Sequence, residues 1–197
     1  MKLVTDSNFA ILILAAGTSK RLGFPKQLVK YKGATLLEHA VSTALFISPN
    51  VYVVLGYAYE ECAKALDRLP VATLYNPNYA EGMGNTIAFG IEQLQNYKHV
   101  LIMLCDQPYI PMNHFLAMKD TMMQNPQSII SSYYNDQPGV PAIFPDETFS
   151  ALALLRGDKG AKTLLSSFHS KYVSIESKYM MDIDSIEDLV KLANGKS

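Results

Sequence analysis

FAILILAAGTSKRLGFPKQL, residues 9–28, is the stretch that decides the fold of this chain. The segment from Phe9 to Leu14 is apolar throughout, which is typical of a buried β-strand. The sequence then changes to small residues and three cations, Lys20, Arg21 and Lys26. Small residues after a strand leave backbone N–H groups free to point at an anion, and the cations add the matching field. The stretch therefore predicts a strand followed by a loop that binds the polyphosphate of a nucleotide.

Length and composition limit what the rest of the chain can be. Its 197 residues are enough for one domain with a substantial core and too few for two ordinary ones, and 49% are hydrophobic. The formal net charge of -1 argues against a general binder of nucleic acid or of membrane surfaces, because both need a basic face. Cys62 and Cys105 have no metal-type spacing and are expected to be buried free thiols.

The sequence also bears on location. The segment from Met1 to Asn8 is polar and lacks the regions of a signal peptide, and no apolar run approaches ~18 residues. We therefore expect a cytoplasmic protein with no membrane span.

Strand-like and helix-like segments alternate along the chain. Near-continuous apolar strands separated by helices predict a mostly parallel sheet covered on both faces, a three-layer α/β/α fold of Rossmann-like type. We expect one domain over residues 1–197. The predicted strands are Ala10–Leu14, Val51–Leu55, Val71–Tyr75, Val100–Cys105, Ile129–Tyr133, Val140–Phe144 and Tyr172–Ile175. The predicted helices are Leu36–Phe46, Tyr59–Leu69, Thr86–Gln95, Asn113–Met123 and Ser185–Ala193, with two short ones near residues 157–160.

The loop after the first strand lacks the two best-known phosphate motifs. A Walker A loop needs Gly, four residues and then Gly-Lys-Ser/Thr, and a dinucleotide fingerprint needs Gly-x-Gly-x-x-Gly. Neither pattern is present between Ala15 and Leu28. The alternative to a nucleotide loop of another type is a basic surface loop after an edge strand.

That loop resembles the signature of the nucleoside-triphosphate transferases, Leu-Ala-x-Gly-x-Ser-x-Arg-Met-Gly followed by Lys. Leu22 replaces the usual Met. The resemblance implies a nucleotide-diphospho-sugar transferase type of fold, with Arg21 and Lys26 as catalytic cations that counter the charge of the leaving pyrophosphate. It assigns nucleotide binding to Leu14, Ala15, Ala16, Gly17, Gly23, Gly82 and Asp106.

Carboxylates occur at two informative places in the sequence: Asp106 follows the strand-like run Val100–Cys105, and Asp182 and Asp184 lie near the C-terminus. Asp106 would lie at the sheet edge where ligands bind, and a carboxylate there can hold Mg²⁺ against triphosphate oxygens. Asp182 and Asp184 alternate as in a strand and would share a face. The resemblance places Mg²⁺ or Mn²⁺ on Asp106 and Asp184. The structural alternatives are that Asp106 caps its loop and that Asp184 or Ser185 caps the last helix.

A glycine-containing loop, residues 76–86, follows the third predicted strand. Gly82 and Gly84 permit close approach of the backbone, and Asn85 or Thr86 could cap the next helix. In similar enzymes this loop lies over the base and ribose. Gly84, Asn85 and Thr86 replace the family's usual Ser residues, so the base contacts are not fixed, and a purely structural turn explains the loop equally well.

Two segments of the second half resemble molybdenum cofactor cytidylyltransferases, the MocA-like branch within the MobA-like NTP transferase family. These are 137–141, with Gly-Val-Pro, and 156–162, with Gly-Asp-Lys-Gly-Ala. The resemblance implies a C-terminal half that binds a molybdopterin-type acceptor, through Gly139, Pro141, Gly157, Asp158 and Gly160. Without it, both segments are ordinary Gly/Pro turns.

The resemblance leads to a specific expected reaction. An Ala-Ala-Gly start goes with CTP in related enzymes, so CMP would pass from CTP to the terminal phosphate of molybdenum-bearing molybdopterin, with release of pyrophosphate. A molybdenum hydroxylase or its chaperone is a further partner that it suggests. Two alternatives stay open: a cytidylyl- or guanylyltransferase acting on another phosphorylated small molecule such as a sugar phosphate, and a non-catalytic carrier or chaperone of the cofactor.

Overall fold

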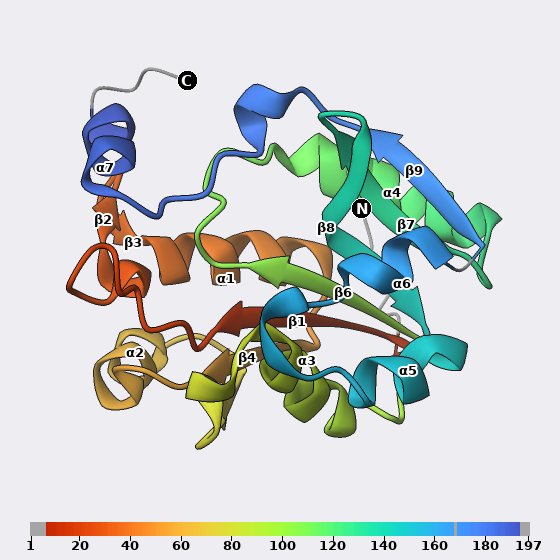
Figure 1. The fold of residues 1–197 in the computed structure, drawn as a ribbon, viewed down its shortest axis with the longest axis horizontal. Helices are drawn as coiled ribbons and strands as arrows, with labels where there is room; N and C mark the ends of the chain where they lie inside the picture. Colours follow the sequence, from red (N-terminus) through yellow and green to blue (C-terminus); the bar gives the residue numbers. More distant parts are fainter. Residues whose placement is uncertain (1–6, 168, 194–197) are drawn as a thin grey trace.

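The computed structural model describes residues 7–167 and 169–193, and its centre is a seven-stranded sheet (Figure 1). The strand order is β5-β4-β1-β6-β8-β7-β9. The bounds are β1 (Phe9–Ala15), β4 (Val51–Leu55), β5 (Ala72–Tyr75), β6 (His99–Leu104), β7 (Ile129–Tyr134), β8 (Gln137–Pro145) and β9 (Ser170–Ser174). A separate hairpin pairs β2 (Lys30–Tyr31) with β3 (Ala34–Thr35).

Most pairings in the large sheet are parallel. β1 runs parallel to β4 and β6, β4 parallel to β5, and β7 parallel to β9. β8 runs antiparallel to both of its neighbours, and its register against β7 shifts between Ser131 and Ser132, which marks a β-bulge. The C-terminal ends of the parallel strands therefore lie along one edge, where open sheets of this kind bind ligands.

Helices cover both faces of the sheet. One apolar cluster joins β1 to α1 (Leu36–Ile47), α2 (Tyr59–Leu66) and α4 (Met112–Gln124). A second joins the other face to α3 (Met83–Glu92), α5 (Phe149–Ala153) and α6 (Lys162–Ser167). Alternate residues of β1 point to opposite clusters, and every residue of β1 is buried, which explains why the strand is apolar without interruption. The predicted three-layer α/β/α fold is confirmed.

The last helix, α7 (Ile186–Ala193), packs beside the hairpin, and Figure 1 shows both at one end of the molecule. Leu192 and Leu189 contact a small cluster that includes Leu36 and Ile183. Short 3₁₀ turns complete the chain: η1 (Lys26–Leu28), η2 (Tyr79–Glu81), η3 (Asp146–Thr148), η4 (Gly157–Lys159) and η5 (Ser177–Tyr179).

Cys62 and Cys105 are free thiols and both are buried, as predicted. Burial raises the pKa of Cys62 to about 11, so this thiol stays protonated at neutral pH. In the described part of the chain, no helix combines the length and the apolar character needed to cross a membrane.

Candidate active site

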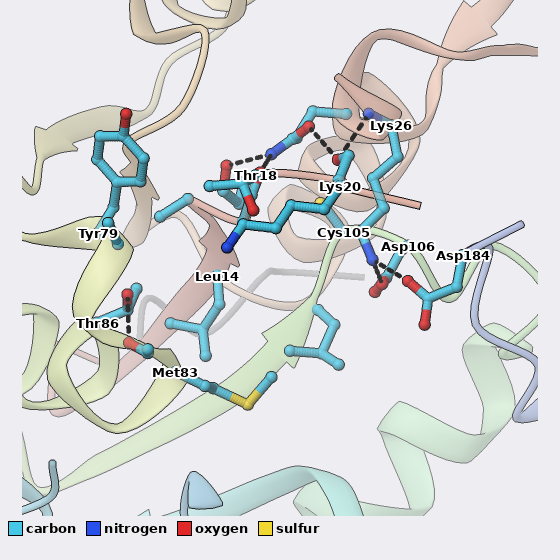
Figure 2. Close-up of a pocket in the computed structure, with 18 of the residues that line it drawn as sticks. Leu14, Thr18, Lys20, Lys26, Tyr79, Met83, Thr86, Cys105, Asp106 and Asp184 are labelled. Carbon is cyan, nitrogen blue, oxygen red and sulfur yellow. Dashed lines mark hydrogen bonds and ion pairs between the residues drawn. The ribbon is translucent and has the colours of Figure 1, made fainter. Parts of the chain in front are cut away.

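A cavity of about 560 Å³ opens at the C-terminal edge of the sheet. Its walls come from the loop that follows β1, from the start of α3 and from the end of β6 (Figure 2). Six of the residues labelled in Figure 2 mark the two ends of the cavity. Lys26, Asp106 and Asp184 lie at one end, and Tyr79, Met83 and Thr86 lie at the other.

Gln27 holds the loop after β1 in shape. Its side chain is fully buried, and Nε2 donates to the carbonyl oxygens of Ala15 at 2.9 Å and Gly17 at 2.8 Å. Both carbonyls are therefore bonded within the protein, which holds the loop after β1 in one conformation. Gln27 is a positioning residue that sequence reasoning missed, because a single polar residue beside Lys26 gives no sign that it is buried.

The far end of the loop is a tight turn. Ser19 adopts φ 50°, a left-handed conformation, and its carbonyl accepts from the backbone N–H of Leu22 at 2.9 Å and of Gly23 at 3.1 Å. Ser19 Oγ accepts from the backbone N–H of Lys26 at 3.1 Å. Gly23 has φ 76°, a region that favours glycine, which explains this residue of the signature without placing it at the cavity wall.

Lys26 joins the two carboxylates that were predicted as metal ligands. Its Nζ donates to Asp106 Oδ2, and to Asp184 Oδ1 at 2.6 Å. Arg21 Nη2 reaches the other oxygen of Asp184 at 2.7 Å. The Lys26 and Asp106 side chains are only 16% and 8% exposed, whereas Arg21 is 72% exposed, so the first pair is shielded from water and Arg21 is not. The sequence named these four residues as a set, and the structure brings them together.

The electrostatics of Lys26 follow from this arrangement. Burial disfavours the ammonium form, but the charges and hydrogen bonds of Asp106 and Asp184 outweigh it, and the pKa of Lys26 is raised. Lys26 is therefore a fixed cation across the physiological range and is unsuited to act as a proton acceptor.

The residues fit a divalent metal ion together with a nucleotide. Asp106 and Asp184 converge on one ammonium group, which shows that the two carboxylates can share a single cation. Within the described residues, no cluster of three or more acidic, His or Cys side chains forms a metal cage. Two carboxylates completed by phosphate oxygens and water are what Mg²⁺ normally takes in such sites.

Asp184 and Asp182 do not alternate on a strand, so that prediction was wrong. Residues 180–184 form no regular element, and the backbone N–H of Ile183 donates to the Asp106 carbonyl at 3.0 Å, which ties the segment to the end of β6. Asp182 faces Gln107, whose Nε2 donates to it at 2.8 Å. Burial, reinforced by the charge of Asp106, raises the pKa of Asp182 to about 6.

Ser185 and not Asp184 caps the last helix. Ser185 Oγ accepts from the backbone N–H of Asp188 at 3.2 Å, and the Asp188 carboxylate accepts from the backbone N–H of Ser185 at 2.9 Å. This reciprocal pair leaves the Asp184 carboxylate free to face Arg21 and Lys26.

Helix α3 begins three residues earlier than predicted, at Met83, with Gly82 as its N-cap. Gly82 has φ 108°, which only glycine adopts without strain. Neither Asn85 nor Thr86 caps the helix, because both lie inside its first turn. Thr86 Oγ1 instead donates to the Gly82 carbonyl at 3.2 Å.

The structure also places the residues assigned to the acceptor. Asp158 lines the cavity, and Gly157 and Gly160 stand beside it against the start of α3. Gly139 and Pro141 lie on β8 outside the cavity lining. Ala142 pairs with Ile102 on antiparallel strands, so residues 139–141 extend toward the end of β6 that carries Asp106.

Ten of the predicted site residues therefore line one cavity, and the others lie around it. The lining residues are Leu14, Ala15, Ala16, Gly17, Arg21, Lys26, Gly82, Asp106, Asp158 and Asp184. The roles of all these residues stay predictions.

Fold and site together are typical of an α/β protein that binds a phosphorylated ligand between a glycine-containing loop and paired carboxylates. The chain belongs to the MobA-like NTP transferase domain family, whose model matches residues 11–173. This is a family of nucleotidyltransferases.

Relatives of known name cover most of the chain. It is 33% identical over 165 residues to the nicotine blue oxidoreductase of Paenarthrobacter nicotinovorans, a match that spans 78% of this chain and 79% of the relative. It is 24% identical over 191 residues to the molybdenum cofactor cytidylyltransferase of Escherichia coli, spanning 91% and 92%. A match to the bifunctional protein GlmU of Paracoccus denitrificans, 32% identical over 112 residues, spans 54% of this chain but only 25% of that protein.

Solved structures share the fold along nearly the whole chain. Rv0371c from Mycobacterium tuberculosis superposes with a TM-score of 0.79 at 25% identity, covering 94% of this chain and 97% of that one. A second structure of Rv0371c, in complex with manganese, gives 0.78 at 22% identity and covers 95% and 98%.

Proposed function

We propose that this protein transfers CMP from CTP to the terminal phosphate of a molybdopterin-type acceptor that carries molybdenum, and releases pyrophosphate. The observation that carries the proposal is the ion-pair cluster of Lys26, Asp106 and Asp184 beside a preformed loop. That cluster has the charges that a metal-bound triphosphate requires.

No general base is needed for this reaction. A phosphate monoester has a second pKa near ~6, so the attacking phosphate is already mostly a dianion at neutral pH. Catalysis then reduces to positioning the two phosphates and neutralising charge as pyrophosphate leaves. Lys26, held at the mouth of the loop, stabilises the charge near the α-phosphate, and the exposed Arg21 accompanies the leaving group.

Asp106 and Asp184 are the residues that would hold Mg²⁺ or Mn²⁺, which would supply charge neutralisation at the triphosphate. The manganese complex of Rv0371c supports a divalent ion in a protein of this fold. Once a nucleotide is present, Lys26 can exchange its carboxylate partners for phosphate oxygens.

The choice of substrates rests on resemblance. The Ala15-Ala16-Gly17 start and the match to the Escherichia coli cytidylyltransferase over 91% of this chain favour CTP and a molybdenum cofactor. On the same grounds we propose a cytoplasmic location and an acceptor enzyme, a molybdenum hydroxylase or its chaperone, as the recipient of the product.

Other functions compete with this one. The same site would serve a cytidylyl- or guanylyltransferase acting on a sugar phosphate, and a cofactor carrier would bind without turnover. A redox function is a further candidate, because one relative is named as an oxidoreductase. Against a carrier stands the cluster around Lys26, because binding alone does not require metal-triphosphate chemistry.

The test is direct. Purified protein is incubated with Mg²⁺, molybdenum-loaded molybdopterin and either CTP or GTP labelled at the α-phosphate, and transfer of label and release of pyrophosphate are followed. We expect transfer from CTP, none after chelation of the metal, and almost none with Asp106→Asn. Transfer from GTP, or transfer to a sugar phosphate alone, would select the cytidylyl- or guanylyltransferase that acts on another phosphorylated small molecule. Binding without transfer would select the carrier, and a redox change of nicotine blue without transfer would select the redox function.

A further inference from the structure

Two segments that the sequence assigned to different substrates lie in direct contact. The turn η4, residues 157–159, packs against the beginning of α3, so that a Cβ added to Gly82 would lie 2.5 Å from Asp158 Oδ1 and 2.5 Å from the carbonyl carbon of Gly157. A Cβ added to Gly84 would lie 2.9 Å from the backbone of Arg156. Only glycine at both positions permits this contact.

A side chain fastens the two segments. Asn85 Oδ1 accepts from the backbone N–H of Gly157 at 2.7 Å, and Asn85 Nδ2 donates to Glu81 Oε2 at 2.7 Å. Asn85 stands where similar enzymes carry a Ser, which is too short for both bonds. The bond fixes the residue that follows Gly157, which is Asp158.

Asp158 lines the same cavity as the phosphate loop. In the part of the chain that the structure describes, its carboxylate has no ion-pair or hydrogen-bond partner. It is therefore an exposed acceptor at the cavity wall that has no donor among the described residues. A carboxylate repels phosphate, so the ligand group that it meets is an uncharged donor.

Charged and uncharged side chains lie at opposite ends of the cavity, and this arrangement indicates which part of a nucleotide faces Asp158. Lys26 stands at one end, and Met83 and Thr86 stand at the other, next to Gly82 and hence to Asp158 (Figure 2). A nucleotide is divided in the same way, because its charge lies in the triphosphate and its uncharged donors lie in the nucleoside. The triphosphate end therefore faces Lys26 and the nucleoside end faces Asp158.

We propose that Asp158 belongs to the nucleotide-binding half of the site, where its carboxylate accepts hydrogen bonds from uncharged donors of the nucleoside, and that Asn85 is its positioning residue. The donor is the ribose 2′-hydroxyl or the amino group of the base. The inference rests on the proposed function in requiring a nucleoside triphosphate in this cavity. It reassigns Asp158 from the acceptor-binding residues to the nucleotide-binding residues.

The experiment measures equilibrium binding by calorimetry in Mg²⁺, with CTP, 2′-deoxy-CTP and UTP as probes. UTP carries a carbonyl where CTP carries the amino group. Wild type is compared with Asp158→Ala, Asp158→Asn and Asn85→Ser, and Glu147→Ala deletes an exposed carboxylate outside the cavity as the matched control. A hydrogen bond to a charged group corresponds to a change of about tenfold to a hundredfold in Kd.

We expect Asp158→Ala to weaken CTP by that factor and to abolish the preference over one analogue. Loss of the preference over 2′-deoxy-CTP identifies the ribose, and loss of the preference over UTP identifies the base. Asp158→Asn, which keeps one acceptor oxygen, recovers part of the affinity. Asn85→Ser weakens CTP by a smaller factor and adds little in the Asp158→Ala background, because the two residues act as one unit.

Unchanged CTP affinity in Asp158→Ala, or equal weakening of all three nucleotides, would overturn the inference. Binding needs no acceptor, so a wild-type protein that binds CTP and transfers nothing contradicts the proposed function alone. A wild-type protein that binds none of the nucleotides would overturn both.

Discussion

The loop after β1 and the loop around η4 line the same cavity, and each is held by an amide side chain, but the two amides are built in differently. Gln27 is fully buried and donates to two backbone carbonyls. Asn85 is partly exposed and accepts one backbone N–H, from Gly157. Water can replace the Asn85 bond, whereas the Gln27 side chain and its bond to the Ala15 carbonyl are buried, so the loop after β1 is the more rigid of the two.

This difference matches the chemistry at the two ends of the cavity, the rigid end beside the loop after β1 and the flexible end beside η4. Every nucleoside triphosphate presents the same phosphates, so a rigid, charged loop can serve them all at no cost of reorganisation. The nucleoside and the acceptor differ between substrates, and the segments that face them can change with little effect on the core. Family members with different names are then expected to share the first loop more closely than the second.

The largest effect is expected at the rigid end, on turnover. Lys26→Ala removes the cation placed between the carboxylates and should lower kcat/KM by about a thousandfold, as loss of a single transition-state charge does elsewhere. Lys20→Ala removes another cation of the same loop, one without a carboxylate partner among the described residues, and should cost far less. Steady-state pyrophosphate release measures both. Similar losses in the two variants would mean that total charge, and not the position of Lys26, matters.

The second prediction concerns the stability of the same loop. Gln27→Leu keeps the volume but leaves the buried Ala15 carbonyl without this donor and also removes the bond to the more exposed Gly17 carbonyl, so we expect a loss of about 3 kcal/mol in the free energy of unfolding and weaker CTP binding. Urea denaturation and calorimetry measure the two effects. Gln93→Leu, an exposed glutamine after α3, is the control and should change neither. A variant as stable as wild type would show that the loop does not depend on Gln27.

The third prediction tests the sheet beneath the acceptor segment. Ser132 Oγ donates to the Pro141 carbonyl at 2.9 Å, so it accepts from His114 Nε2 at 2.8 Å. Burial lowers the pKa of His114 to about 4, and in the unfolded chain it is about 6.5. The unfolded state binds the extra proton, so this contribution is complete above pH 6.5 and is lost as the pH falls toward 4.

The expected size of that loss is up to about 3 kcal/mol between pH 6.5 and 4. It is read from the difference in unfolding free energy between wild type and His114→Asn at each pH, since other groups cancel in the difference. His169→Asn, at an exposed histidine, should show no such dependence. A flat difference for His114→Asn would place the imidazole in contact with water.

Local patterns in the sequence predicted much of this fold. The strand Val51–Leu55 has the predicted bounds, and α1 begins at the predicted Leu36, where Thr35 and Glu38 form a capping box. Both depend on residues close in the chain. The start of α3 was misplaced because Gly82 became an N-cap through contact with Gly157, which is 75 residues away, and the antiparallel direction of β8 depends on its neighbours in the sheet.

The residues of the site also divide into those that the sequence could predict and those that depend on packing in the folded protein. The loop signature predicted Arg21 and Lys26, the place after a strand predicted Asp106, and the resemblance to the family predicted Asp184. Gln27 could not be found, since its role depends on burial that only the folded loop creates. The contact of Asp158 with Gly82 is likewise a product of packing between distant segments.

The fourth prediction separates charge from position at the rigid end, with metal binding as the readout. Lys26 contacts both carboxylates, so a metal ion bound by Asp106 and Asp184 competes with it. Lys26→Ala should bind Mn²⁺ about tenfold more tightly than wild type in the absence of CTP, since one favourable ion pair no longer competes. Electron paramagnetic resonance of free Mn²⁺ measures this. Lys20→Ala removes the same charge without freeing a carboxylate, so equal gains in both variants would contradict the competition.

The smallest effect is expected at the flexible end, on stability. Asn85→Ser breaks the bond to Gly157, but water can satisfy the freed N–H, so we expect a loss of only about 0.5 kcal/mol, well below that for Gln27→Leu. Urea denaturation of the two variants side by side tests the comparison, because each removes an amide that holds a loop. If Asn85→Ser destabilised the protein as much as Gln27→Leu, the η4 loop would be part of the rigid core. Asp158 would then be fixed as firmly as the phosphate loop, and nucleoside recognition would be built into the fold in the same way as phosphate binding.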